Sequence, residues 1–325
     1  MPLLSTLRRC SVALLLALAA APGLARAEDN LRILSDPAFL PRQYQFLGNT
    51  TFIQAVTTQN KVDSQQLVSG SRSTTSNQLS QSLSFGLWDD MTVKLTDTMI
   101  WQQVATTTPG QSAVSVDDQG LSDPTLAATW RCLDQREHFL SWDWLASYSP
   151  NLLEDVSGST SRIGTDARGG QSILLGTAAS WMTPYITVYT DFEETYLSTR
   201  QVVNTNNSVT QYDGYWQGML ALNTQFRFSD YLSLNAGFTG DWNGPYDGVN
   251  QGSGLGFTVG GGDEFTINAA LNAPVIPNAL ALSLTYSNTF YSDRNSVYPN
   301  SPGSNNGSSG EVLNSFGLRV LYVFL

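Results

Sequence analysis

The sequence predicts an all-β fold, a transmembrane antiparallel β-barrel of about 12 strands. Three observations lead to this fold class. Apolar and polar residues alternate through long segments, short and long connections alternate between these segments, and charged residues make up only 13% of the chain. Soluble domains contain about 25% charged residues, whereas a barrel in lipid needs an apolar outer face and a polar interior.

About 12 segments carry the alternating pattern, and each reaches roughly the 9–11 residues that a tilted strand needs to cross a hydrocarbon core. The predicted strands cover residues 48–58, 75–87, 91–104, 122–133, 138–149, 171–182, 185–197, 213–228, 231–242, 263–273, 279–291 and 312–325. Residues 216–238 show the pattern clearly, because Trp216, Leu220 and Phe226 fall on one side of the strand and mainly polar residues fall on the other. Such alternation turns the apolar set towards lipid and the polar set towards the lumen.

The connections between these strands alternate in length. Tight connections are predicted at residues 88–90, 134–136, 183–184, 229–230 and 274–278, and long ones include 151–169, 198–212, 243–262 and 292–311. Bacterial outer-membrane barrels have short periplasmic turns and long extracellular loops. The alternation therefore favours a barrel over a soluble sandwich and orients it in the membrane.

Two places fit this pattern poorly. In the strand at 91–104, Asp97 falls in the outward set between Leu95 and Met99. A carboxylate facing lipid costs free energy, so we expect a β-bulge that turns Asp97 inward. The first strand, 48–58, is poorly patterned, so its limits are defined only to within several residues.

Both ends of the chain carry export features. Arg8 and Arg9 precede the apolar run 12–21, and Ala25, Arg26 and Ala27 form a signal-peptidase site, which predicts a cleaved signal peptide at residues 1–27. The last strand alternates up to Phe324 and resembles the terminal signal by which outer-membrane proteins are recognised. The predicted partners are therefore the barrel assembly machinery during biogenesis and, afterwards, the lipid and lipopolysaccharide of a Gram-negative outer membrane.

The charge of the mature chain excludes one class of partner. Without the three arginines of the signal peptide, 13 Lys and Arg face 27 Asp and Glu, a net charge of 13 − 27 = −14. A chain this acidic is repelled by nucleic acid. Cys132 is the single cysteine of the mature sequence, which leaves no internal disulfide and no cysteine-based metal site.

A resemblance to one family rests on residues 120–151. The stretch GLSDPTLAATWRCL, residues 120–133, resembles the Gly-Leu-(Gly/Ser)-Asp-x-x-Leu strand of a family of outer-membrane transporters associated with the meta-cleavage pathway of phenol degradation. The stretch HFLSWDWLASYSPN, residues 138–151, is similar to that family's strand ending before a Pro-containing loop, although the usual Gly after Pro150 is missing. The resemblance implies a barrel linked to the passage of aromatic or other hydrophobic small molecules.

No catalytic constellation accompanies the barrel pattern. Outer-membrane phospholipases need a Ser–His pair, but the one histidine, His138, is predicted at the periplasmic rim in the context HFLSW. We therefore expect no enzyme. Asp117, Asp118, Glu154 and Asp155 lack the spacing of a dedicated Ca²⁺ site, and neither a metal nor another cofactor is predicted.

Parity assigns a set of side chains to the lumen. The predicted pore-lining residues are Lys94, Asp123, Arg131, Asp143, Tyr185, Tyr189, Asp191, Glu193, Tyr215, Arg227, Tyr231, Glu264 and Arg319, with Asp241 and Tyr291 on the same parity. Charged side chains at close quarters govern which solutes pass a pore, and tyrosine rings offer apolar faces with polar rims. The alternative for the charges is that they pair across the lumen and fill it. The alternative for the tyrosines is that they belong to the aromatic girdles or to packing.

The predicted organisation leaves two functions open. Residues 28–46 are either a periplasmic leader or a plug that enters the barrel at 47–325, and the Gly-rich loop 252–262 is a second candidate constriction. An open lumen predicts a channel or passive transporter for small molecules, including hydrophobic or aromatic compounds. A plugged lumen predicts a structural or surface-interaction barrel that works through its outer loops.

Overall fold

The computed structural model describes residues 38–63, 68–107, 114–152, 155–156, 170–203, 209–276, 279–299 and 306–324. The predicted signal peptide at 1–27, the leader up to residue 37 and most of the loop 151–169 lie outside the described residues. Within the described ranges, no helix is long and apolar enough to span a bilayer.

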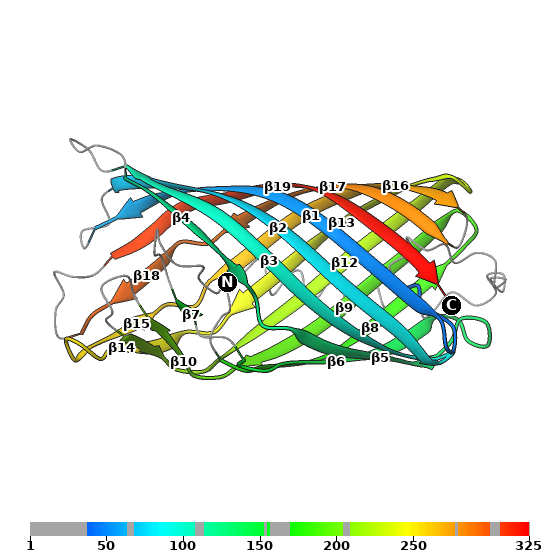
Figure 1. Ribbon diagram of the computed structural model, residues 1–325, viewed down its shortest axis with the longest axis horizontal. Helices are drawn as coiled ribbons and strands as arrows, with labels where there is room; N and C mark the ends of the chain where they lie inside the picture. Colours follow the sequence, from blue (N-terminus) through cyan, green and yellow to red (C-terminus); the bar gives the residue numbers. More distant parts are fainter. Residues whose placement is uncertain are drawn as a thin grey trace.

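The described strands close into a 12-strand antiparallel barrel, as predicted (Figure 1). The wall consists, in spatial order, of β1 (Phe46–Val62), β2 (Val68–Trp88), β3 (Met91–Thr107), the consecutive pieces β4 (Val114–Leu121) and β5 (Thr125–Leu133), β6 (Ser141–Ser149), β8 (Ser172–Met182), β9 (Ile186–Leu197), β12 (Tyr215–Ser229), β13 (Leu232–Asn243), β16 (Asp263–Ile276), β17 (Leu280–Tyr291) and β19 (Asn306–Phe324). β1, whose limits were uncertain, extends beyond the predicted 48–58 at both ends and pairs with β2 and β19.

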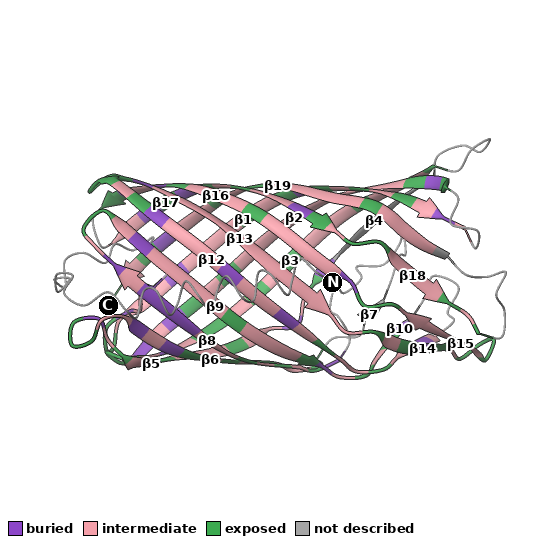
Figure 2. Cartoon of the chain, turned by 180° about the vertical axis from the view of Figure 1, so that it is seen from behind, coloured by how far each residue is buried: buried purple, intermediate pink, exposed green. Residues whose placement is uncertain are grey.

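The alternation of the sequence sorts side chains between the two faces of the wall. Leu284 on β17 is 60% exposed on the outer face, whereas its neighbour Ser283 is 1% exposed inside. Trp144 and Phe316 are likewise exposed outwards. Figure 2 shows the buried residues gathered towards the end of the barrel that carries the tight turns. The predicted apolar exterior and polar interior are confirmed.

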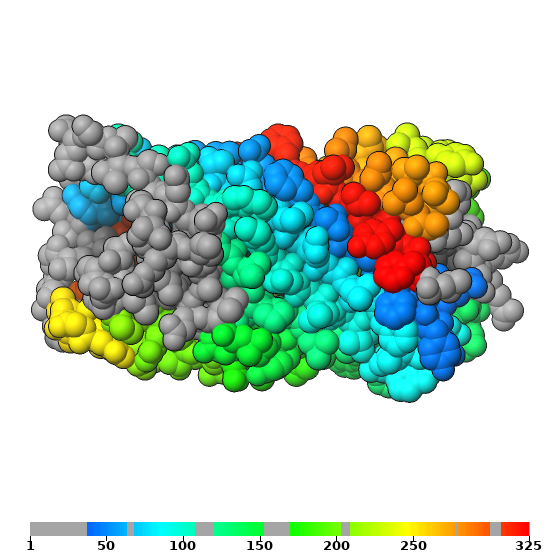
Figure 3. Space-filling view, in the orientation of Figure 1, coloured from blue at the N-terminus to red at the C-terminus, as the bar shows by residue number. Residues whose placement is uncertain are grey.

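Closure of the barrel joins the two ends of the described chain. β19 pairs with β1 from Phe324 opposite Phe46 to Gly307 opposite Val62. Figure 3 shows the red C-terminal strand running beside the blue first strand. A closed sheet leaves no edge whose backbone groups would lack partners in lipid.

We expect a charge on the outer face to destabilise the barrel much more than the same charge in the lumen. Leu284→Arg places a guanidinium in the hydrocarbon, which costs about 2–4 kcal/mol at the bilayer midplane, while Thr285→Arg on the same strand points it into the polar interior. Reversible unfolding in denaturant from lipid vesicles measures both. Equal losses of unfolding free energy would contradict the assignment of the two faces.

The long loops add strands to the end opposite the tight turns (Figure 1). These are β7 (Asp155–Val156), β10 (Arg200–Val203), β11 (Val209–Tyr212), β14 (Tyr246–Asn250), β15 (Leu255–Val259) and β18 (Arg294–Val297). β11 pairs with β14 and β15 with β18, so neighbouring loops continue the wall. β2 has 21 residues, more than the roughly 9–11 that cross the hydrocarbon, and the barrel therefore extends beyond the membrane.

One tight turn is longer than predicted. β5 ends at Leu133 and β6 begins at Ser141, so the strand predicted from 138 starts three residues late. The side chain of Gln135 holds this turn, because its amide donates to the Met182 carbonyl at 2.7 Å and its oxygen accepts from the Met182 amide at 2.8 Å. These bonds tie residues 134–140 to the neighbouring strand β8.

The predicted bulge at Asp97 was wrong. β2 and β3 keep one register from Ser71 opposite Thr107 to Gly86 opposite Thr92, and Asp97 remains exposed. The irregularity lies in the adjacent wall strand, which is interrupted at residues 122–124.

The interruption explains a carboxylate on this face. Pro124 has no N–H to donate to a neighbouring strand, and the regular pairing of β3 passes from β5 to β4 at this point. The Thr98 amide bonds instead to the Asp97 carboxylate at 2.9 Å. The strand predicted at 122–133 therefore consists of β5 preceded by a break at the Ser122-Asp123-Pro124 motif.

Candidate functional site

The chain reverses direction at the rim of the barrel just before β1. Tyr44 has a φ of 63°, a left-handed conformation that few non-glycine residues adopt. Its amide donates to the Gly86 carbonyl at 2.8 Å, and the Gly86 amide donates to the Gln45 carbonyl at 3.0 Å. This turn directs the preceding residues into the lumen from the end with the tight turns.

Residues 38–41, hereafter the N-terminal segment, pack inside the barrel. Ala38 and Pro41 are buried. Phe39 packs against Ala281 and Leu321, which form the apolar core of the interior at this end. The segment thus occupies part of the lumen.

A buried ion pair holds the N-terminal segment to the wall. The Arg131 guanidinium donates to the two carboxylate oxygens of Asp143 at 2.8 and 3.0 Å, and it also donates to the Ala38 carbonyl at 2.7 Å. Arg131 and Asp143 are each only 4% exposed. A planar guanidinium suits this arrangement, because it can bind a carboxylate with two N–H groups and still present another donor.

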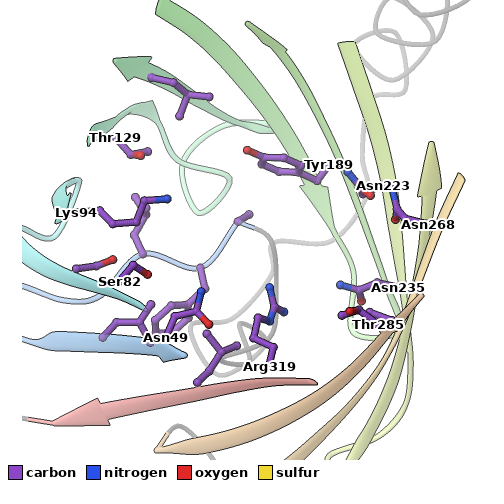
Figure 4. A pocket seen from close by; sticks show the side chains of 18 of the residues that line it. Asn49, Ser82, Lys94, Thr129, Tyr189, Asn223, Asn235, Asn268, Thr285 and Arg319 are labelled. Atoms are coloured by element: carbon purple, nitrogen blue, oxygen red, sulfur yellow. The ribbon is translucent and has the colours of Figure 1, made fainter. Parts of the chain in front are cut away.

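The N-terminal segment borders a cavity of about 630 Å³ in the lumen. Its size falls within the range of small-molecule pockets, roughly 300–1,000 Å³. Figure 4 shows side chains from all around the wall converging on it, namely Asn49, Ser82, Lys94, Thr129, Tyr189, Asn223, Asn235, Asn268, Thr285 and Arg319. Phe39 and Leu40 of the N-terminal segment add an apolar surface. The cavity therefore combines polar side chains, two cations and a substantial apolar surface.

Five of the predicted pore-lining residues line this cavity: Lys94, Asp143, Tyr189, Glu193 and Arg319. A sixth, Arg131, lies behind them as the partner of Asp143. They come from β3, β5, β6, β9 and β19, and closure of the barrel brings them together.

Other members of the predicted set lie elsewhere in the barrel. Asp191 shares the inward parity of Tyr189 and Glu193 on β9. Glu264 accepts hydrogen bonds from Arg294 and Asn243.

Tyr215 stacks on Tyr246 of the outer strand β14 with 4.5 Å between ring centroids. Arg227 lies two residues before the end of β12, close to the tight turn. The described part of the cavity wall includes neither of these two residues.

Three predicted residues occupy turns or breaks. Tyr185 and Tyr231 lie in tight turns and are 72% and 64% exposed, which is typical of an interfacial girdle. Asp123 lies in the wall interruption, where its carboxylate accepts a hydrogen bond from the Leu152 amide at 2.9 Å. None of the three is among the described lining residues of the cavity.

Sequence reasoning did not single out the asparagines of the cavity. Asn49, Asn223, Asn235 and Asn268 all line it, and their inward parity was visible in the sequence. Uncharged amides carry neither the charge nor the aromatic ring by which pore-lining residues were predicted. Depth along the strand, which decides that they meet at one level, is not encoded in parity.

The structure places His138 in the exposed turn between β5 and β6. Among the described residues, no group of three or more His, Cys, Asp or Glu side chains is arranged to hold a metal ion.

The same turn predicts a pH dependence. Partial burial acts to raise the pKa of Asp134, but hydrogen bonds from the Arg136 side chain at 3.1 Å and backbone at 2.9 Å, together with its charge, hold this pKa below the usual 3.8. A lowered carboxyl pKa adds stability above its unfolded value, and that stability is lost as the pH falls from about 4 through the folded pKa. Denaturant unfolding between pH 7 and pH 2 should show a smaller acid loss in Arg136→Gln, and an unchanged loss would contradict this role.

Comparison with known proteins identifies the type of barrel. The sequence matches no protein-family profile and no curated protein. The structure of an outer-membrane channel from Pseudomonas putida F1 is similar with a TM-score of 0.56 and 12% sequence identity, over 89% of this chain and 99% of that chain. The transport unit of the autotransporter AIDA-I from Escherichia coli is similar with a TM-score of 0.50 and 13% identity, over 95% of this chain and 96% of that one. The chain therefore has the fold of an outer-membrane β-barrel, which together with its apolar exterior places it in the outer membrane.

Proposed function

We propose that this chain is an outer-membrane channel through which small molecules, including hydrophobic or aromatic compounds, cross passively. The observation that carries the proposal is the cavity of about 630 Å³ inside a closed barrel, lined by residues from eleven wall strands. A polar lumen inside an apolar wall gives solutes a path that avoids lipid.

Support for aromatic solutes comes from two directions. Tyr189 and Phe39 offer ring surfaces to the cavity, and such rings attract aromatic bodies while leaving polar rims for hydrogen bonds. The resemblance of residues 120–151 to transporters associated with phenol degradation points the same way. The similar structure from Pseudomonas putida F1 is itself an outer-membrane channel.

The N-terminal segment favours the second function, a plugged barrel. Residues 38–41 occupy the lumen and are held there by Arg131. In this case the long outer loops carry the function by binding a surface partner. Binding of lipopolysaccharide and recognition by the assembly machinery stay predictions in either case.

Current through single barrels separates the two functions. The detergent-solubilised protein is inserted into a planar bilayer in potassium chloride, and phenol and sucrose are added in turn. Discrete current steps that phenol reduces and sucrose leaves unchanged support a channel for aromatic compounds. Reduction by sucrose alone would contradict the aromatic solute, and the absence of steps would contradict the channel and favour the plugged barrel.

A further inference from the structure

The lumen has a second cavity, and it shares a wall with the first. This outer cavity has a volume of about 500 Å³ and is lined by Lys61, Arg72, Arg294 and Glu311 among other residues. Lys61 and Arg72 belong to β1 and β2, Arg294 to β18 and Glu311 to β19. The inner cavity has Lys94 on β3 and Arg319 on β19.

The strands that carry these cations are neighbours. β18 pairs with β19, β19 with β1, β1 with β2, and β2 with β3. We call the five side chains Lys61, Arg72, Lys94, Arg294 and Arg319 the basic wall. It runs from the outer cavity to the inner one along one side of the lumen.

Two members of the basic wall are available to a solute. Among the described residues, Lys94 and Arg319 form no ion pair, in contrast to Arg131 and Arg294. The Nε of Arg319 is buried without a hydrogen-bond partner. Figure 4 shows both side chains directed into the inner cavity with Asn49 between them. A buried guanidinium with an unsatisfied donor favours an anionic ligand.

Carboxylates occur on both sides of the lumen, because Glu311 lines the outer cavity with Arg72 and Glu264 pairs with Arg294. Glu193 and Asp191 are on β9, Asp241 is on β13 and Glu264 is on β16, where it lies opposite Asp241 in the register. Of these, Glu193 lines the inner cavity. In the inner cavity, several wall strands separate Glu193 on β9 from Lys94 on β3 and from Arg319 on β19.

This separation limits the charge that the inner cavity accepts. Lys94 and Arg319 are two unpaired cations, Glu193 is one carboxylate, and the Arg131–Asp143 pair cancels. The excess is 2 − 1 = 1 positive charge, which one carboxylate neutralises. A second carboxylate on the far end of the solute would approach Glu193 and be repelled.

The remaining surface of the inner cavity suits an apolar or aromatic body. Tyr189 lies across the cavity from Lys94 and Arg319 (Figure 4), and Phe39 and Leu40 border the cavity. Asn223 and Asn268 lie beside Tyr189 and offer hydrogen bonds to a ring substituent. A solute whose anionic group meets Lys94 and Arg319 thus places its body against Tyr189 and the N-terminal segment.

We propose that the channel selects small monocarboxylate anions with an apolar or aromatic body, and that Lys94 and Arg319 bind the carboxylate in the inner cavity. The proposal rests on the proposed function and names its solute class. The basic wall supplies further cationic positions, Lys61 and Arg72, along the path from the outer loops.

The test uses benzoate as the probe in planar bilayers. A gradient of potassium benzoate gives the permeability of benzoate relative to K⁺ from the reversal potential, and phthalate replaces benzoate as the dicarboxylate. In Lys94→Gln/Arg319→Gln we expect the benzoate ratio to fall at least about tenfold, because two favourable charges are removed. Arg136→Gln removes a charge in a periplasmic turn and should leave the ratio unchanged. Equal benzoate ratios in the double variant and the wild type, or phthalate passing as well as benzoate, would overturn the proposal.

Further measurements separate a loss of the binding site from a loss of folding or of conductance. Heat-dependent mobility on gels checks that the double variant folds, and Arg319→Lys, which keeps the charge, should retain most of the benzoate permeability. If neither the wild type nor any variant conducts, the channel function is wrong. Titration calorimetry of benzoate with the detergent-solubilised protein then still tests whether Lys94 and Arg319 bind the carboxylate. Binding lost in the double variant and kept in Arg136→Gln supports the site, whereas the same heat in all variants excludes it.

Discussion

Removal of the N-terminal segment is expected to raise the single-channel current at least about twofold, because it widens the path beside the inner cavity. Two variants achieve this in different ways. Deletion of residues 29–41 removes the segment and the chain that precedes it. Gly86→Leu leaves the sequence of the segment intact, but a Cβ at this position would overlap the carbonyl oxygens of Arg42 and Pro41, so the segment must shift away from the rim.

The control for both variants is a chain in which residues 38–41 are replaced by Gly-Ser-Gly-Ser. It keeps the chain length and loses the contact of Phe39 with Ala281 and Leu321, so we expect an intermediate and noisier current. If all three currents equal that of the wild type, the N-terminal segment does not restrict the path. If the current rises only in the deletion variant, the residues before 38 restrict the path instead.

Among the substitutions proposed for this barrel, breaking the Arg131–Asp143 pair is expected to give the largest loss of unfolding free energy. The pair is buried, with side-chain exposures of 2% and 6%. Arg131→Met leaves the Asp143 carboxylate uncompensated, which costs about 3–5 kcal/mol of unfolding free energy. Arg131→Met/Asp143→Leu removes both charges, and we expect its stability to return close to that of the wild type, since apolar residues of similar volume often replace buried pairs without loss.

Denaturant unfolding followed by tryptophan fluorescence measures these changes. The exposed pair Arg136–Asp134 provides the control, because breaking a surface ion pair changes stability by less than about 1 kcal/mol. The double variant also lacks the hydrogen bond from Arg131 to the Ala38 carbonyl, so its current should rise as in the Gly86→Leu variant. A double variant as unstable as Arg131→Met would show that the site needs polar groups for other reasons.

The wall of the barrel could be predicted because its signal is local. Side chains alternate along a strand with a period of two, so the local sequence alone assigns Leu284 to the outer face and Ser283 to the inner face. Short turns such as the one between Ser229 and Leu232 are encoded in adjacent residues, and with them the orientation of the barrel. The differences between the predicted and the observed strands arose from contacts between strands. Gln135 lengthened one turn by bonding to Met182 on another strand, and Asp97 stayed outside because the break at Pro124 left the Thr98 amide for it to bind.

The candidate site depended on the tertiary structure. Parity alone assigned Lys94, Tyr189, Glu193 and Arg319 to the lumen, but it also included Tyr185 and Tyr231, which lie in turns. Which inward residues meet depends on their depth along the strand and on the shear of the closed sheet, and both are set by pairings between distant segments such as β1 and β19. The sequence by itself therefore determined the barrel, its strands and its two faces. Only the folded chain decided that residues 38–41 lie in the lumen and that unpaired cations face Tyr189 across one cavity, because such distances follow from closure of the whole wall.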